Sequence, residues 1–224
     1  MKRHIVCLGD SNTHGYCADP GDCADGALLR FNEDERWTCL LQKALGEEFL
    51  VLEEGLSGRT TVFDDPLYEH LAALDYIWPC LKSHEPVCLL IVMLGTNDTK
   101  ERFGANAHAI GLGMRRLVQK AQAVDCWGPG GEPKILIVAP PPIGEGVRSS
   151  PVVEEMGTMG PGCVEKSRRL AGKYRQVAEE TGCYFLDAGE LGCAFNTIDF
   201  MHLTRAGHAA LAAALADWVA EFVR

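Results

Sequence analysis

The chain has 224 residues, 47% of them hydrophobic and 23% charged, which is enough to bury the core of one globular domain. This balance argues against a disordered or fibrous protein. The formal net charge is −10, from 31 acidic and 21 basic residues. An acidic chain is not expected to bind nucleic acid or an anionic membrane as its main partner, because both are bound by basic patches.

Ten cysteines are spread along the chain, and no two of them form the C-x-x-C pair of zinc ribbons and thioredoxin-type motifs. Several, such as Cys7 and Cys88, lie in apolar runs, as small buried hydrophobes do in a reducing compartment. The apolar run 5–8 is too short for the core of a signal peptide, and no run approaches the roughly 20 residues of a membrane span. The sequence predicts a soluble cytoplasmic protein that binds no membrane.

Apolar runs of strand length alternate with longer helical patterns. Strands are expected at residues 4–8, 49–53, 87–94, 134–139 and 184–186. Most of these runs are continuous in Val, Ile and Leu, which is typical of parallel strands buried on both faces. Helices are expected at about residues 35–46, 67–83, 104–124, 162–181 and 204–223, with Thr204 as the N-cap of the last one. The alternation predicts a single α/β domain over residues 1–224, a three-layer α/β/α sandwich with a five-stranded parallel sheet.

The stretch 140–162 after the fourth expected strand is irregular. It opens with three consecutive prolines and continues with scattered Gly, Ser, Pro and Met. Loops of this length are usually functional or mobile, and a plain surface excursion is the alternative. Exposed apolar groups in such a loop usually find a partner surface, so a homo-oligomer is expected. The apolar residues concerned are Val152, Val153, Met156 and Met159.

Small polar clusters follow four of the five expected strands. They occupy residues 9–12, 54–61 and 95–98 and, a dozen residues after the fifth strand, residues 199–202. Ligands of open parallel sheets bind beyond the carboxyl ends of the strands. These clusters are therefore the candidate site.

The residue types in the clusters suit nucleophilic catalysis. Ser11 follows a strand and a glycine, where a tight turn at a helix start presents its hydroxyl. A serine nucleophile needs a base, which His202 can supply, and Asp199 can hold the histidine ring in the correct tautomer. The Asn97 amide and the backbone N–H groups of Ser11 and Gly58 can donate to a developing oxyanion. At Gly58 the missing side chain allows close approach.

Each cluster alone has an ordinary explanation. Ser11 and Asn97 could cap helices, and the D-x-x-H spacing could belong to a solvated loop or to a metal site. Four clusters in this order at four strand ends are much harder to assign to chance.

The same blocks resemble the four signature blocks of the SGNH (GDSL-type) hydrolases, over nearly the whole chain. The matching blocks are Gly9-Asp10-Ser11, Ser57-Gly58, Gly95-Thr96-Asn97-Asp98 and Asp199-x-x-His202. Longer strings are similar to the subgroup of aryl esterases, acyltransferases and perhydrolases. These strings are Arg36-Trp37-Thr38 and the segments 53–61, 64–66 and 93–100.

The resemblance implies Ser11 as nucleophile, His202 as base and Asp199 as the residue that orients it. It implies an oxyanion hole made by the N–H groups of Ser11 and Gly58 and by the Asn97 side chain. It also implies a flavodoxin-like sheet and no metal or cofactor. Members of the subgroup are often homo-oligomers whose neighbouring subunits narrow the active-site entrance.

The chain departs from the subgroup's acyltransferases after the nucleophile, where Asn12, His14 and Tyr16 replace bulky apolar residues. Efficient acyl transfer in water needs a dry entrance. The expected activity is therefore hydrolysis of small acyl or aryl esters through a Ser11 acyl-enzyme, with acyl transfer or perhydrolysis as a side activity. A carbohydrate O-deacetylase of the same fold is the alternative within enzymes.

Two interpretations compete with this one. The segment 55–59 nearly matches the G-x-S-x-G elbow around Ser57, but Arg59 stands in place of the final glycine. A non-catalytic, flavodoxin-like binding module would lack any nucleotide fingerprint. Asp10 and Asp98 are expected to cap turns or brace loops, and His208 to be a surface or packing residue. Arg59 could be structural or could contact substrate.

Overall fold

Five parallel strands form one sheet in the order β2-β1-β3-β4-β5. The computed structural model describes residues 1–128, 130–152 and 159–223. The strands are β1 (Arg3–Gly9), β2 (Phe49–Gly55), β3 (Val87–Met93), β4 (Ile135–Ala139) and β5 (Tyr184–Asp187). All neighbouring strands are parallel, so the predicted fold class is confirmed.

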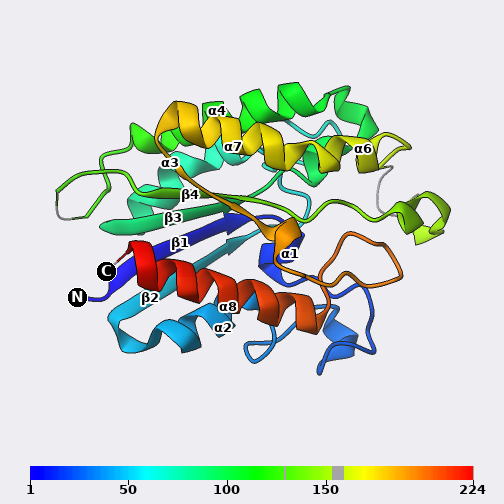
Figure 1. Ribbon diagram of the computed structural model, residues 1–224, viewed down its shortest axis with the longest axis horizontal. Helices are drawn as coiled ribbons and strands as arrows, with labels where there is room; N and C mark the ends of the chain where they lie inside the picture. The colour runs from blue at the N-terminus through cyan, green and yellow to red at the C-terminus, as the bar shows by residue number, and fades with distance from the viewer. Residues whose placement is uncertain (129, 153–158, 224) are drawn as a thin grey trace.

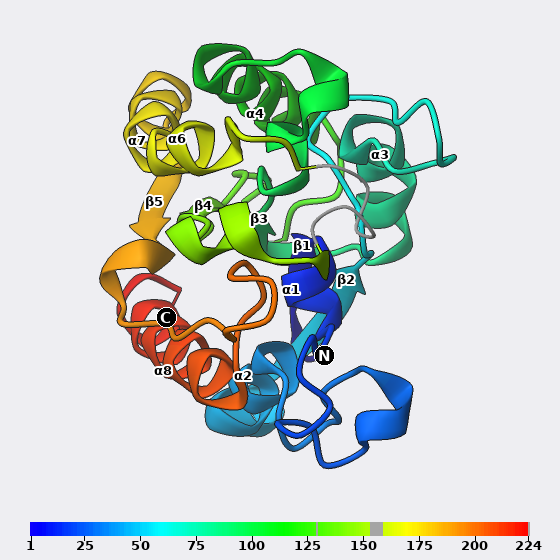
Figure 2. The same ribbon diagram turned by 90° about the vertical axis from the view of Figure 1, so that its right-hand side faces the viewer.

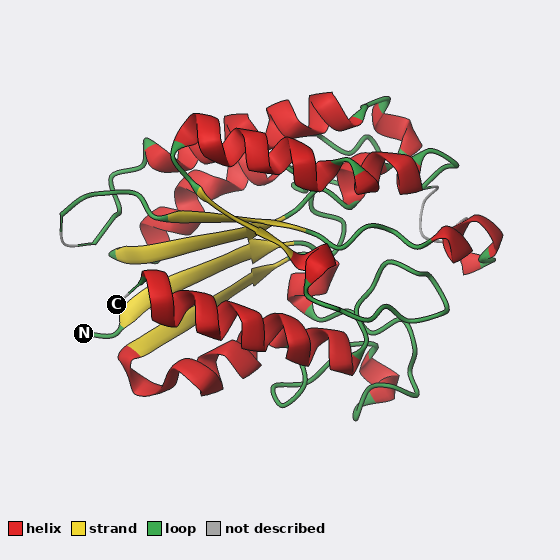
Figure 3. Ribbon diagram, in the orientation of Figure 1, coloured by secondary structure: helices red, strands yellow, loops and turns green. Residues whose placement is uncertain are grey.

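Two layers of helices cover the sheet (Figures 1 and 3). One face carries α3 (Ala73–Ser83), α4 (Ala107–Gln122) and α7 (Leu170–Thr181), and the other carries α2 (Trp37–Leu45) and α8 (Arg205–Phe222). The central strand β3 contributes side chains to the hydrophobic cores under both helix layers, because successive side chains of a strand point to opposite faces. Leu90 and Val92 pack under the first layer, whereas Leu89 and Ile91 pack under the second.

The helices differ from the predicted ones at three places. The expected helix 67–83 begins only at Ala73, and the residues before it form a loop at the surface. The expected helix 162–181 is divided at Arg169 into α6 (Cys163–Arg168) and α7. A single turn, α1 (Ser11–His14), follows β1. The predicted cap is confirmed, since the Thr204 hydroxyl accepts a hydrogen bond from the Gly207 N–H at 3.1 Å.

The stretch 140–162 is more than a surface excursion. It contains a short 3₁₀ helix, η5 (Glu145–Ser149), and its side chains Ile143, Val147 and Met159 pack in one cluster with Met201 of the segment 199–202. Met159 is 1% exposed, so the prediction that it seeks a partner surface is wrong: it is buried within its own chain. Val152 is half-buried, and Val153 and Met156 lie outside the described residues.

Eight of the ten cysteines are free, and four of these are buried. Cys7 is fully buried as predicted, whereas Cys88 is only half-buried. Cys17 and Cys23 differ, because they are joined as a disulfide within the loop that follows α1. Among the described residues, no helix is both long enough and apolar enough to cross a membrane.

Candidate active site

The turn between β1 and α1 presents Ser11 at the carboxyl edge of the sheet (Figure 2). Asp10 caps this turn, as predicted, because its carboxylate accepts a hydrogen bond from the Asn12 N–H at 3.0 Å. The turn lies tightly against the end of β2. A Cβ placed on Gly55 would come within 2.2 Å of the His14 nitrogen. Backbone packing, and not a long helix, therefore fixes the serine.

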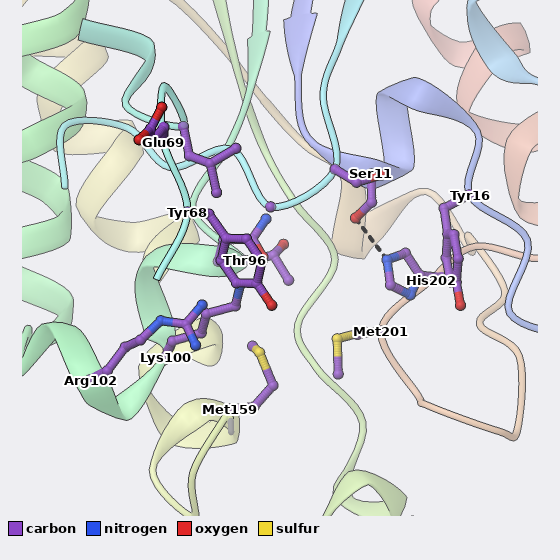
Figure 4. A pocket seen from close by; sticks show the side chains of 14 residues that line it. Ser11, Tyr16, Tyr68, Glu69, Thr96, Lys100, Arg102, Met159, Met201 and His202 are labelled. Carbon is purple, nitrogen blue, oxygen red and sulfur yellow. Dashed lines mark hydrogen bonds between the residues drawn. The ribbon is translucent and has the colours of Figure 1, made fainter. Parts of the chain in front are cut away.

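The structure brings Ser11, His202 and Asp199 together in one hydrogen-bonded chain. His202 Nε2 lies 2.7 Å from Ser11 Oγ (Figure 4). On the other side of the ring, His202 Nδ1 lies 2.7 Å from Asp199 Oδ2. The Asp199 and His202 side chains are 1% and 3% exposed. A histidine that holds a proton on Nδ1 toward Asp199 leaves Nε2 free to accept the serine proton.

Asp199 is held as a carboxylate by several donors. Burial raises its pKa, but hydrogen bonds from His202 and from the backbone N–H groups of Met201 and His202 outweigh burial, and the pKa is about 2. Asn196 adds a further donor, because its amide lies 2.9 Å from Asp199 Oδ1 and 2.8 Å from the His202 carbonyl. The sequence analysis missed Asn196, although an amide three residues before the acid is a local signal that could have been read.

Asn12 joins the nucleophile turn to the histidine loop. Its amide donates to the Met201 carbonyl at 3.1 Å and accepts from the Leu203 N–H at 3.0 Å. Asn12 is 2% exposed, so it does not form the polar entrance expected from the sequence. Tyr16 does line the cavity, with its ring 4.6 Å from the His202 ring in an edge contact.

The three expected oxyanion donors belong to Ser11, Gly58 and Asn97, which line one cavity. Gly58 has a φ of +88°, a left-handed conformation that glycine adopts without strain. The Asn97 amide nitrogen lies 3.1 Å from the Arg59 carbonyl and 3.5 Å from an Asp10 oxygen. The shorter contact orients the amide, and the longer one is weak enough to yield to an incoming oxyanion.

Two buried aspartates support these loops. Asp98 accepts from the backbone N–H of Thr61 at 2.9 Å and from the Thr61 hydroxyl, so it braces neighbouring loops as predicted. Burial raises the pKa of Asp98 to about 6, against the hydrogen bonds from Thr61. Burial also raises the pKa of Asp10 to about 6, although the Asn12 N–H and nearby His202, Lys100 and Arg59 oppose it.

Arg59 and His208 are structural. The Arg59 guanidinium is buried, donates to the Gly9 carbonyl at 3.1 Å and also to the Glu54 carbonyl, and stacks over Tyr76. His208 is fully buried, and its Nδ1 lies 3.3 Å from the Trp37 N–H. Burial lowers the pKa of His208 to about 3, so it is a neutral packing residue.

The cavity in front of Ser11 has a volume of about 490 Å³. Tyr16, Met201 and His202 lie on one side of it, and Tyr68, Lys100 and Arg102 lie on the other (Figure 4). Ser57 also lines this cavity, but none of its described contacts is with a histidine. The geometry therefore favours Ser11 over the elbow-like segment as the nucleophile.

One group of metal-ligand side chains occurs among the described residues, away from this cavity. Glu54, Cys80 and His84 offer ligand atoms within 4.8 Å of one another. Sequence spacing gives no sign of the group, because it joins a strand to a helix. Glu54 and His84 already share a hydrogen bond of 2.6 Å, and the Tyr76 hydroxyl donates to Glu54 at 2.8 Å. None of the three residues lines the catalytic cavity.

Comparison with known proteins places the chain in a family. Residues 7–210 match the model of the GDSL-like lipase/acylhydrolase family. The chain belongs to this family. A search of curated proteins returns no match.

Solved structures of two esterases are similar to this acylhydrolase over nearly its whole length. An aryl esterase from M. smegmatis is 37% identical, with a TM-score of 0.85, over 97% of this chain and 98% of that one. A carbohydrate acetylesterase from Sinorhizobium meliloti is also 37% identical, with a TM-score of 0.85, over 98% and 99% of the two chains. The resemblance expected from the signature blocks is confirmed.

Proposed function

We propose that this acylhydrolase cleaves small carboxylic esters through a covalent Ser11 acyl-enzyme. The hydrogen-bonded chain from Ser11 through His202 to Asp199 is the observation that supports the proposal most directly. His202 Nε2 takes the serine proton while Oγ bonds to the carbonyl carbon. The ring then gives that proton to the departing alcohol oxygen, and a water molecule repeats the steps to release the acid.

The oxyanion formed in each step is stabilised by donors that are in place beforehand. The proposed donors are the N–H groups of Ser11 and Gly58 and the Asn97 amide. The Gly58 N–H has no acceptor among the described residues, so it is available to the substrate. Donors fixed in advance avoid the reorganisation that water would need.

Ser11→Ala tests the mechanism. Activity on 4-nitrophenyl acetate should fall by roughly 1000-fold or more, because the covalent route is lost. A melting curve should show that the variant is folded, and a fluorophosphonate probe should label the wild type alone. Turnover close to wild type in folded Ser11→Ala would reject the mechanism and make Ser57→Ala the next variant to assay.

Deacetylation of an acetylated sugar is the second candidate. The relative from Sinorhizobium meliloti, a carbohydrate acetylesterase, supports it. The aryl esterase from M. smegmatis supports aryl esters equally well. A rate profile across acyl lengths and acetylated sugars, with Ser11→Ala as the blank, separates the two substrate classes.

Acyl transfer is proposed only as a side activity. The cavity is lined in part by the apolar side chains Met159 and Met201, which favour an organic acceptor over water. With an ester donor and added alcohol, the new ester should form at a lower rate than the free acid. A product ratio dominated by the new ester at low alcohol would contradict this.

A cytoplasmic location is proposed on the strength of the eight free cysteines, because thiols persist in a reducing compartment. The Cys17–Cys23 disulfide argues for an oxidising one. Thiol counting on protein from freshly lysed cells distinguishes them, with ten thiols expected in the cytoplasm and eight elsewhere.

A further inference from the structure

Lys100 is a buried lysine that lines the catalytic cavity. It lies two residues after the Gly-Thr-Asn-Asp block that follows β3, and it is 6% exposed. Among the described residues its ammonium group forms no ion pair and donates no hydrogen bond. An ammonium ion offers three donors, and a buried one is normally paired.

The acids near Lys100 are committed to other partners. Asp65 receives two bonds from Arg102, at 3.1 Å from Nε and 2.5 Å from Nη2. Asp98 accepts from Thr61, and Asp10 accepts from the Asn12 N–H. Arg102 and Asp65 pair with each other, and Asp10 and Asp98 act on the lysine only from a distance, so Lys100 has no direct ion-pair partner among the described residues.

Glu69 is the acid among the described residues that line the cavity, and it does not pair with Lys100. Glu69 lies at the surface, 92% exposed, where its carboxylate is 3.7 Å from His70. Figure 4 shows Glu69 and Lys100 on different sides of Tyr68. An exposed carboxylate is screened by water and contributes little to a buried charge.

Burial makes the charged lysine unfavourable until an anion arrives. It lowers the pKa of Lys100, and nearby Arg102 lowers it further, against the opposing effects of Asp65, Asp10 and Asp98. A negatively charged ligand group would supply the direct partner that the lysine lacks. Charge-assisted hydrogen bonds of this kind are among the stronger polar contacts.

The position of Lys100 indicates which half of an ester it would meet. The leaving alcohol must lie near His202, because the ring returns a proton to its oxygen. The oxyanion must point to Gly58 and Asn97. The acyl chain then extends away from the histidine, and Lys100 lies on that side of the cavity (Figure 4).

We propose that Lys100 forms an anion subsite for the acyl group, so that the enzyme takes esters of acids with a second carboxylate, such as hemiesters of dicarboxylic acids. This inference rests on the proposed ester hydrolysis and names its substrate class. The carboxylate is bound and does not react, so the subsite acts mainly on KM.

Lys100→Met tests the subsite, because methionine keeps the length of the side chain and removes the charge. Monoethyl adipate and ethyl hexanoate form the substrate pair, since they share the six-carbon acyl chain and differ in the terminal carboxylate. The kcat/KM for monoethyl adipate divided by the kcat/KM for ethyl hexanoate should fall by about 10- to 100-fold in Lys100→Met. This range corresponds to the loss of one charged hydrogen bond. Lys100→Arg should retain much of the wild-type ratio.

Lys166→Met is the matched control. Lys166 is a neighbouring lysine outside the cavity, and its ammonium donates to the Thr99 carbonyl at 3.1 Å. Removing it changes the net charge by the same amount, so the substrate ratio should stay within about twofold of the wild-type value. An equal fall in Lys166→Met would mean that a general field, and not a subsite, selects the anion.

The arms of the experiment separate the ways in which the inference can fail. A substrate ratio unchanged by Lys100→Met overturns the subsite. The pair 3-acetoxypropionate and propyl acetate carries the carboxylate on the alcohol part of the ester. If Lys100→Met lowers the kcat/KM ratio of this pair instead, the assignment of the subsite to the acyl side is overturned. If wild type hydrolyses none of the four esters, the proposed function fails instead.

Discussion

The Asn97 amide already has two hydrogen-bond acceptors in the free protein, and the lengths of these two contacts decide whether it can also bind an oxyanion. The contact to the Arg59 carbonyl is 3.1 Å and the contact to Asp10 is 3.5 Å. An oxyanion can displace the second, because charged acceptors bind an amide N–H more strongly than a distant carboxylate edge does. A donor used in this way stabilises the transition state more than the bound ester.

Asn97→Ala should therefore lower kcat by roughly 100- to 1000-fold with little change in KM. Asn97→Asp should be worse than alanine, because a carboxylate there would face both the oxyanion and the buried Asp10. Kinetics of both variants, with melting curves, check the ranking. If Asn97→Asp is the more active of the two, Asn97 is not an oxyanion donor.

Asp98 makes a separate prediction about stability. Burial raises its pKa to about 6, and one of its oxygens has no partner among the described residues. A raised pKa means that the folded state binds the proton more tightly than the unfolded state, so this group's contribution to stability falls as pH rises from about 4 to 6. Asp98→Asn removes that contribution and keeps an oxygen to accept from Thr61.

Relative to wild type, the melting temperature of Asp98→Asn should rise by roughly 2–8 °C between pH 4 and pH 6 and stay level above pH 6. Asp125→Asn is the control, because Asp125 is exposed and the substitution removes the same charge. Thermal melts at several pH values decide the matter. A difference from wild type that does not vary with pH would mean that Asp98 is not the titrating group.

Single residues were predictable from the sequence where a motif states them. Ser11, Asn97 and His202 stand in signature blocks, and the fold brings them to one cavity. Asn12 and Lys100 are different, because their roles depend on partners that they have or lack across the fold. No local sequence pattern predicts which lysine becomes buried in the folded chain without an acidic side chain in contact with it.

Among the elements, the nucleophile turn α1 is fixed by contact with the end of β2. A methyl group on Gly55 would lie 2.2 Å from the His14 nitrogen and 2.5 Å from the Thr13 carbonyl carbon. Both neighbours are backbone atoms, which cannot move without shifting the whole turn. Because Ser11 begins this turn, the contact links the packing of an element to the geometry of the site.

Gly55→Ala should therefore reduce kcat by at least about tenfold and lower the melting temperature, since overpacking costs roughly 1–3 kcal/mol. Gly172→Ala is the control, because nothing lies within 4 Å of a Cβ at that position in α7 and alanine favours a helix. Its activity should be that of wild type. Full activity in Gly55→Ala would show that α1 adapts, and that the turn is not positioned by this contact.

The strands were predicted well and the helix boundaries less well, for a physical reason. A parallel strand buried on both faces is a continuous apolar run, and such runs end where the sheet ends. The start of α3 has no such mark: the helix has no side-chain cap, and the expected residues 67–72 form a loop instead. That loop carries Tyr68, which lines the cavity.

At the scale of the molecule, the exposed apolar side chains bear on assembly. Leu67 and Tyr68 are 66% and 59% exposed, and Trp78 on the following helix is 56% exposed. Burying such groups against a second copy would be favourable, and Tyr68 places this surface at the mouth of the cavity. The argument for assembly thus moves from Met159, which is buried, to the segment 67–78.

We therefore predict a homo-oligomer whose contact includes Leu67 and narrows the active-site entrance. Light scattering at micromolar concentration should give a mass that is a multiple of 24.4 kDa. Leu67→Glu should lower that mass, because a buried carboxylate without a partner is costly. Leu28→Glu should not, although Leu28 is 75% exposed, since it lies on a different loop, in the 3₁₀ turn Gly26–Leu28. If light scattering gives the mass of a monomer for wild type, the prediction is wrong and Tyr68 borders an open cavity. If Leu67→Glu and Leu28→Glu lower the mass equally, the contact lies elsewhere on the surface.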